Sequence, residues 1–117
     1  MKALSIAIVV HVTDLEASLS YYIDVLGFTM DFRFGDYAGL LLDDVLIHLS
    51  GPNNEGQKKP PGGAHFCIDL NEIDDYYQLL QRKGTNITVA MADRIYGIRD
   101  FAVDDPDGNT IVFGMAI

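Results

Sequence analysis

The chain has 117 residues, 49% of them hydrophobic and 21% charged, so its composition is that of one globular domain and not of a disordered or fibrous chain. The 17 Asp and Glu outnumber the 8 Lys and Arg and give a formal net charge of −9, which excludes a nucleic-acid partner from our expectations. No apolar run approaches the roughly 20 residues of a membrane helix, and the single Cys67 cannot form an internal disulfide, so we expect a cytoplasmic protein without membrane contact.

The first half of the chain predicts one β-α-β-β-β unit. Leu4–Val12 is short and rich in Ile and Val, which predicts a strand buried on both faces. Asp14 is placed to cap a helix, and apolar side chains at three- and four-residue steps carry that helix to about Leu26 before Gly27 ends it. Three further apolar runs predict strands at Phe28–Phe34, Tyr37–Leu42 and Val45–Ser50.

The second half repeats this order after a linker. Gly51–Gly63 concentrates Gly, Pro and Asn without periodicity, which is typical of a linker. The turn residues Asp105–Gly108 place Pro second and Gly fourth, as in a type I turn that closes a hairpin. The elements predicted beyond the linker are a strand at Ala64–Leu70, a helix at Glu72–Lys83 closed by Gly84, and strands at Ile87–Ala92, Arg99–Asp104 and Thr110–Met115.

The two halves are therefore predicted to be copies of one unit. Asp43–Ser50 can be laid over Asp107–Gly114, and the units cover about residues 1–50 and 64–117 of a single domain, 1–117. A four-stranded sheet with one helix leaves a face exposed, so two such sheets must cover each other or pair across a dimer. The expected fold is α+β, with two βαβββ modules forming a cupped mixed sheet around a cavity of ligand size.

Two separated stretches carry a family resemblance that spans nearly the whole chain. The first is Asp14–Ser18 leading to Tyr21-Tyr22 and Leu26–Phe28, and the second is Tyr96–Phe101 leading to Asp105–Asn109. The pattern resembles the vicinal oxygen chelate superfamily, which includes glyoxalases, bleomycin resistance proteins and extradiol dioxygenases. The resemblance implies paired βαβββ modules and a homodimer whose cupped sheets hold the active or binding site.

The resemblance also marks four positions at which metal-dependent members carry His, Gln or Glu ligands. The matching residues here are Ala7, His48, His65 and Val112, so only two of the four can bind a metal. Zinc, nickel and non-haem iron sites need more side-chain nitrogen or oxygen donors than two. A divalent metal held by His48 and His65 alone would therefore be weakly bound, and we expect no obligatory cofactor.

Three residues are candidates for the polar lining of the cavity. His48 and His65 both fall on ligand positions of the family pattern, although each could instead be a buried histidine with a backbone partner. Cys67 shares the strand parity of His65, so it should line the same cavity, but no sequence feature indicates an activated thiol.

Three further residues complete the predicted ligand site, and each has a structural alternative. Tyr37 and Phe101 are strand aromatics that could stack on a planar ligand, or that could pack in the core. Arg99 could bind a ligand carboxylate as a bidentate fork, or pair with one of the many acidic residues of the chain.

These residues favour a small-molecule binding protein over an enzyme. Neither a nucleophile motif nor a phosphate-binding glycine fingerprint is present. We therefore expect a homodimer that sequesters a small cationic or aromatic ligand in its cavity, in the way that antibiotic-sequestering bleomycin resistance proteins do. The alternative is a glyoxalase- or dioxygenase-like enzyme, with a divalent metal on His48, His65 and a third ligand such as Asp69. A purely structural dimerisation module is the third hypothesis.

Overall fold

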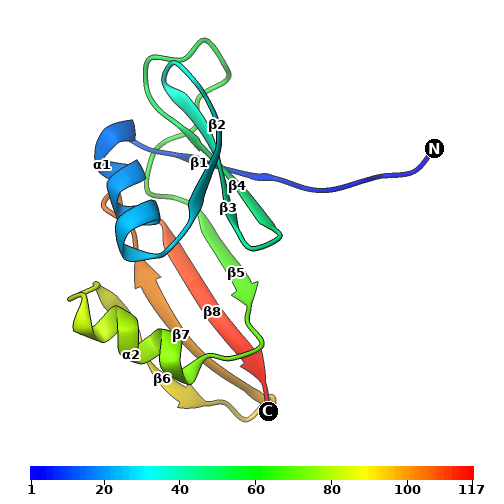
Figure 1. The fold of residues 1–117 in the computed structure, drawn as a ribbon, viewed down its shortest axis with the longest axis vertical. Helices are drawn as coiled ribbons and strands as arrows, with labels where there is room; N and C mark the ends of the chain where they lie inside the picture. Colours follow the sequence, from blue (N-terminus) through cyan, green and yellow to red (C-terminus); the bar gives the residue numbers. More distant parts are fainter. The chain divides into compact units, whose positions relative to one another are not determined.

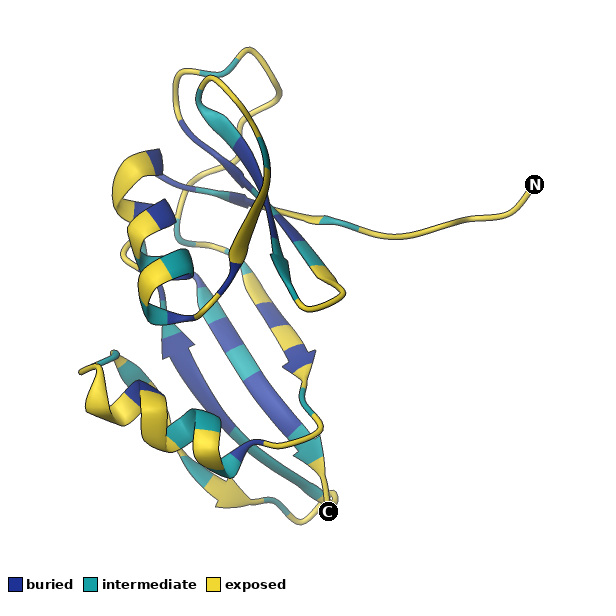
Figure 2. Cartoon of the chain, viewed as in Figure 1, coloured by how far each residue is buried: buried dark blue, intermediate teal, exposed yellow.

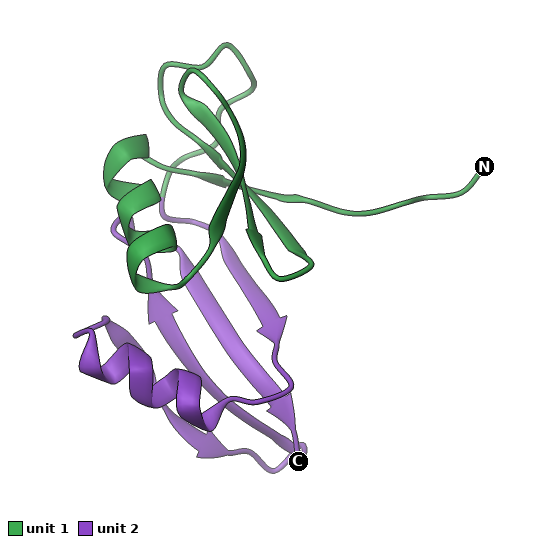
Figure 3. Cartoon of the chain, in the orientation of Figure 1, with its two compact units in different colours: residues 1–61 green, residues 62–117 purple.

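The computed structural model describes residues 1–117, which divide into two compact units, Met1–Pro61 and Gly62–Ile117 (Figures 1 and 3). The boundary between the units falls inside the predicted linker. None of the helices combines the length and apolar character that a membrane crossing requires. The elements are, in chain order, β1 (Ile8–His11), α1 (Leu15–Ser20), a π-helical turn (Tyr21–Val25), β2 (Thr29–Phe34), β3 (Tyr37–Leu42), β4 (Val45–Ser50), β5 (His65–Asp69), α2 (Asp74–Arg82), β6 (Ile87–Asp93), β7 (Ile98–Asp104) and β8 (Thr110–Ala116).

Each unit contains one four-stranded mixed sheet, and both sheets have the same topology. The strand order is β1-β4-β3-β2 in the first unit and β5-β8-β7-β6 in the second. In each sheet the first strand runs parallel to the last, and the remaining neighbours are antiparallel. The predicted α+β class and the duplicated β-α-β-β-β order are confirmed.

The sheet of the second unit has one face packed on a helix and one open face. Along β5 the buried Phe66 and Ile68 alternate with exposed residues, as Figure 2 shows. The buried face meets α2, where the rings of Tyr77 and Phe101 are 4.8 Å apart. Because successive strand residues point to opposite faces, the even-numbered residues of β7 and β8 lie on the open face.

In the first unit the helix follows its predicted course with a wider last turn. Asp14 Oδ1 accepts a hydrogen bond from Ala17 N at 3.1 Å, so the predicted cap is present. Leu26 N donates to Tyr21 O at 3.0 Å, a five-residue step that makes the end of the helix π-helical. The ring of Tyr22, which is fully buried, packs at 5.6 Å from the ring of Phe28.

The prediction of a strand from Leu4 that is buried on both faces was wrong. β1 begins at Ile8, and Leu4 and Ile6 have exposed fractions of 86% and 80%. β4 pairs with β1 from Ile47 to Ser50 only, so residues 1–7 have no neighbouring strand in their unit. Val9 is also 42% exposed, because α1 covers only one face of the sheet.

The turn between β7 and β8 has the predicted hairpin form and also anchors β5. Gly108 N donates to Asp105 O at 3.0 Å, and Asp105 Oδ1 accepts from the backbone N–H groups of Asp107 and Asn109, each at 2.9 Å. Asn109 Oδ1 accepts from Ala64 N at 2.9 Å, one residue before β5 begins. The turn therefore fixes where β5 starts beside β8, which sets the position of the candidate site.

Candidate functional site

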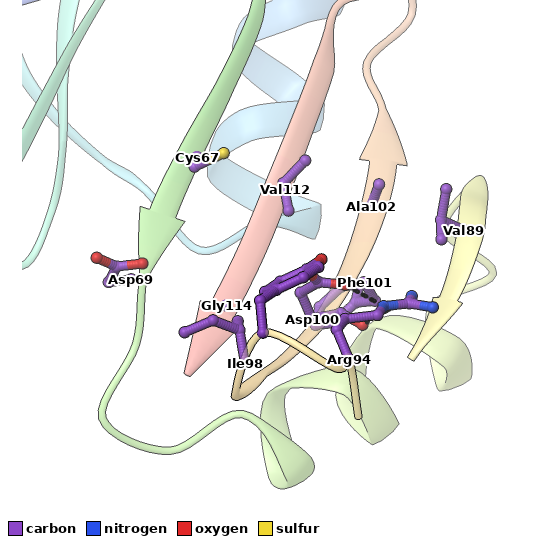
Figure 4. Close-up of a pocket in the computed structure, with 11 residues that line it drawn as sticks. Cys67, Asp69, Val89, Arg94, Ile98, Asp100, Phe101, Ala102, Val112 and Gly114 are labelled. Carbon is purple, nitrogen blue, oxygen red and sulfur yellow. Dashed lines mark hydrogen bonds and ion pairs between the residues drawn. The ribbon is translucent and has the colours of Figure 1, made fainter. Parts of the chain in front are cut away.

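A pocket of about 570 Å³ opens on the free face of the second sheet (Figure 4). Its floor is made by small side chains. Val112 on β8 lies between Ala102 on β7 and Cys67 on β5 in the sheet register, and Gly114 is the next residue of β8 on the same face. Small-molecule sites commonly enclose about 300–1,000 Å³. The hollow is therefore large enough for a drug-sized molecule.

A network around Asp100 forms one rim of the pocket. Arg94 Nε donates to Asp100 Oδ1 at 2.8 Å, and the Tyr96 hydroxyl donates to Asp100 Oδ2 at 2.9 Å. Arg94 Nη2 also donates to the carbonyl of Ala90 at 3.0 Å. The hydrogen bond to Asp100 raises the pKa of Tyr96 above its ordinary value, so this phenol stays neutral near pH 7. The charge of Arg94 offsets that of Asp100.

The opposite rim carries the carboxylate of Asp69, which no positive side chain of the chain pairs with. This residue is exposed at the end of β5, and its carboxylate has neither a hydrogen bond nor an ion pair within the chain. The exposed thiol of Cys67 lies two residues earlier on the same strand, with its sulfur toward Val112 in Figure 4. The pocket thus combines an apolar floor, a neutral phenol and a free carboxylate.

The open face of the first sheet carries an aromatic cluster, which we define as Phe32, Phe34, Tyr37 and His48. The Tyr37 hydroxyl and His48 Nδ1 share a hydrogen bond of 2.8 Å. The ring of Phe32 lies edge-on to His48 at 5.2 Å and covers Gly39, where a Cβ atom would collide with it. Phe34 remains 77% exposed. The structure thus brings the predicted residues Tyr37 and His48 together.

Three other predicted residues lie elsewhere in the second unit. His65 is exposed at the start of β5, opposite Thr110, and does not line the pocket. The ring of Phe101 is fully buried 5.4 Å from that of Phe113, so the residue has the core-packing role that the sequence left open. Phe101 also borders the pocket, although its side chain has the strand parity of the buried face.

Arg99 has the same strand parity as Phe101 and therefore projects to the helix face. Its Nε donates to Asp93 Oδ1 at 2.6 Å and its Nη1 to Asp74 Oδ1 at 3.1 Å. Both carboxylates raise the pKa of this guanidinium. The guanidinium of Arg99 is thus taken up by acidic residues of the chain, which is the structural alternative to binding a ligand carboxylate.

Neither unit has the donor set of a catalytic metal centre. Within either unit no three His, Cys, Asp or Glu side chains come together. Of the four ligand positions inferred from the resemblance, His48 lies opposite Val9 and not Ala7 in the sheet register. Val112 lies opposite Cys67 and not His65. Because structural or catalytic zinc and iron sites take at least three protein ligands, the residues of each unit do not fit one.

Sequence reasoning missed the rim of the pocket. It did not single out Arg94, Tyr96 and Asp100, and it considered Asp69 only as a metal ligand. A usable signal was present, because the open-face positions of β7 and β8 carry unusually small side chains. A row of small residues on an uncovered sheet face indicates a hollow.

Comparison with known proteins places this fold in a family. The chain matches the model of the Glyoxalase/Bleomycin resistance protein/Dioxygenase superfamily over residues 6–113. It is 31% identical to the bleomycin resistance protein of Geobacillus stearothermophilus, with 87% of this chain and 89% of the relative covered.

Two solved structures resemble this fold over almost its full length. The bleomycin-binding protein of Streptomyces verticillus, solved with copper(II)-bleomycin, has a TM-score of 0.78 at 25% identity, covering 97% of this chain and 96% of its own. TioX from Micromonospora sp. ML1 has a TM-score of 0.84 at 17% identity, covering 98% and 100%, and shows likeness of fold alone. The family match and the 31% identity together show that this chain belongs to the glyoxalase/bleomycin resistance protein/dioxygenase superfamily.

Proposed function

We propose that the protein binds a small cationic molecule with an aromatic part in the pocket of the second unit, and sequesters it without changing it chemically. The observation that carries this proposal is the free carboxylate of Asp69 on the rim of a largely apolar hollow of about 570 Å³. Homodimer formation and independence from a bound metal belong to the same proposal.

The charge distribution favours a cation over an anion. Asp100 already pairs with Arg94, so an entering cation meets Asp69 as the unpaired charge, in a chain whose formal net charge is −9. A hydrogen bond to a charged group contributes about 1.5–3 kcal/mol, equivalent to roughly 10- to 100-fold in affinity. Loss of the Asp69 charge alone should therefore be measurable.

The rest of the lining suits an aromatic group. Tyr96 is 67% exposed at the rim, where its ring can contact a planar ligand or the face of a cation. Ala102 and Val112 supply an apolar floor without large side chains. Polar contacts at the rim would orient the ligand, and burial against the floor would add affinity.

The relatives supply a probe for this proposal. The Geobacillus relative is named a bleomycin resistance protein, and the Streptomyces structure contains copper(II)-bleomycin. We expect this chain to bind a ligand of comparable chemistry. Bleomycin, with and without copper, is thus the first compound to titrate.

The test compares two carboxylate variants by isothermal titration calorimetry. Asp69→Asn should weaken binding of bleomycin and of benzylamine by about tenfold or more, and should leave the neutral benzyl alcohol unaffected. Asp75→Asn, at an exposed position on α2, removes the same charge outside the pocket and should change nothing. Equal affinities for both variants, or no binding at all by the wild type, would refute the proposal.

Two further measurements address the metal and the dimer. Metal analysis of protein purified without chelator should find less than stoichiometric metal, because His48 and His65 have too few companion donors in their units. Stoichiometric metal that is lost in both His48→Ala and His65→Ala would instead establish the enzyme alternative. Light scattering after size exclusion should give twice the 12.9 kDa chain mass if the homodimer forms.

A further inference from the structure

The first unit contains a second hollow, of about 350 Å³, between the open face of its sheet and the loop after β4. His11 and Tyr37 contribute from the sheet, and Asn54, Gln57 and Lys59 from the loop. We propose that this hollow is a separate site for the oxyanion of a small organic molecule, a carboxylate or a phosphate monoester. The proposal rests on residues of the first unit alone, so it stands or falls independently of the pocket in the second.

The charges at this hollow oppose those of the whole chain. None of its lining residues is acidic, although the chain has 17 Asp and Glu. The ammonium group of Lys59 has no hydrogen bond or ion pair within the chain. The nearby Asp36 carboxylate accepts from Asn53 N at 2.8 Å, and Glu55 lies in the loop outside the lining. A free cation without a competing carboxylate is the arrangement that an anion requires.

The loop is held in shape by its own hydrogen bonds. Asn54 Nδ2 donates to Ser50 Oγ at 2.6 Å and to the carbonyl of Gly51 at 3.0 Å. Lys58 Nζ donates to Asn54 Oδ1 at 2.7 Å and to the carbonyl of Gly56 at 3.0 Å. The ammonium group of Lys58 is therefore held by the loop and does not line the hollow, whereas Lys59 lines it and can contact a ligand. A site that is already formed loses less entropy when it binds.

The sheet side of the hollow presents groups that are neutral or positive. Lys59 N donates to His11 Nδ1 at 3.4 Å, so neutral His11 carries its proton on Nε2. Burial, followed by the charges of Lys58 and Lys59, lowers the pKa of His11, which indicates a positive local potential. Burial also raises the pKa of Tyr37, so this phenol adds no negative charge.

The size and lining of the hollow select an organic anion over a bare inorganic one. A volume of about 350 Å³ exceeds what a single carboxylate or phosphate group fills. Val9, 42% exposed, adds an apolar wall that a small ring or chain could cover. Phenyl phosphate and benzoate should therefore bind more tightly than inorganic phosphate and acetate, and the better of the two aromatic anions identifies the preferred head group.

The test is an amide NMR titration of the full chain at constant ionic strength. Phenyl phosphate or benzoate should shift the amides of His11, Gln57 and Lys59, whereas benzyl alcohol should not. Lys59→Gln should weaken the binding at least tenfold, and Gln57→Glu, which adds a carboxylate to the lining, should abolish it. Lys2→Gln removes the same charge at an exposed residue near the N-terminus that does not line the hollow, and it should have no effect.

Three results would overturn the proposal: no shift of these amides at an anion concentration of roughly 10 mM, equal weakening by Lys2→Gln and Lys59→Gln, or equal binding of benzyl alcohol. Equal weakening would show a response to net charge and not to a site. The NMR spectra themselves report whether each variant is folded, so a loss of binding cannot be confused with unfolding.

Discussion

Removal of the Asn109 side chain should destabilise the whole second unit. This side chain is 1% exposed and joins the β7–β8 turn to the start of β5. Its Oδ1 accepts from Ala64 N at 2.9 Å, and its Nδ2 donates to Asp105 Oδ2 at 2.9 Å. Asn109→Ala deprives the Ala64 N–H of its acceptor and takes one donor from the Asp105 carboxylate.

The expected cost follows from these two lost hydrogen bonds. A buried group left without its partner costs about 1–3 kcal/mol, and Ala64 is only partly buried. We therefore expect the free energy of unfolding to fall by about 2–4 kcal/mol, a large part of the roughly 5–15 kcal/mol of an ordinary domain. Because β5 carries Cys67 and Asp69, ligand affinity at the second-unit pocket should fall as well.

Urea unfolding followed by circular dichroism measures this loss, and amide hydrogen exchange locates it at Ala64. Asn71→Ala provides the control, because Asn71 is exposed and its side chain makes no hydrogen bond, so its effect should stay below about 0.5 kcal/mol. If Asn109→Ala were as stable as Asn71→Ala, or if exchange at Ala64 stayed slow, the anchoring role of the turn would be refuted.

Three other substitutions test the remaining geometry. Val112→Phe should fill the second-unit pocket and abolish benzylamine binding in calorimetry, while the circular dichroism spectrum stays unchanged. Gly39→Ala should displace the ring of Phe32 and cost about 1–3 kcal/mol in urea unfolding. The lowered pKa of His11 means that folding opposes its protonation, so stability should fall as pH drops below about 6.5, and His11→Gln should lose less between pH 7.5 and pH 5.5.

The elements with local signals were predictable from the sequence. Asp14 as a cap, Gly27 with a φ of 91° after the first helix and the turn at Asp105–Gly108 each depend on a few neighbouring residues. The start of β1 was not predictable, because it depends on how far β4 extends beside it. An Ile- and Val-rich run shows the tendency to form a strand, but it does not show where the partner ends.

The candidate site was only partly predictable, because its residues are chosen by which face of the sheet each side chain occupies and by the register between strands. The register brings Tyr37 and His48 into hydrogen-bonding distance, and no local pattern contains that register. For Arg99 the decisive information was in the sequence: it shares parity with Phe101, whose aromatic ring belongs in the core. Arg99 alternates in step with the buried Phe101 of β7 and therefore faces the helix. Asp69 alternates out of step with the buried Phe66 and Ile68 of β5 and therefore faces the pocket.

The two copies share a backbone but differ in the volume of the side chains on their open faces. In the sheet register His48 occupies in the first unit the place that Val112 occupies in the second. The rings of Phe32 and Tyr37 pack around His48, whereas Val112 has only Ala102 and Cys67 beside it. At this position of the sheet, the same fold therefore holds packed rings in one unit and the floor of a hollow in the other. The volume of the second-unit pocket is thus set by small floor residues, and that of the first-unit hollow by the loop after β4.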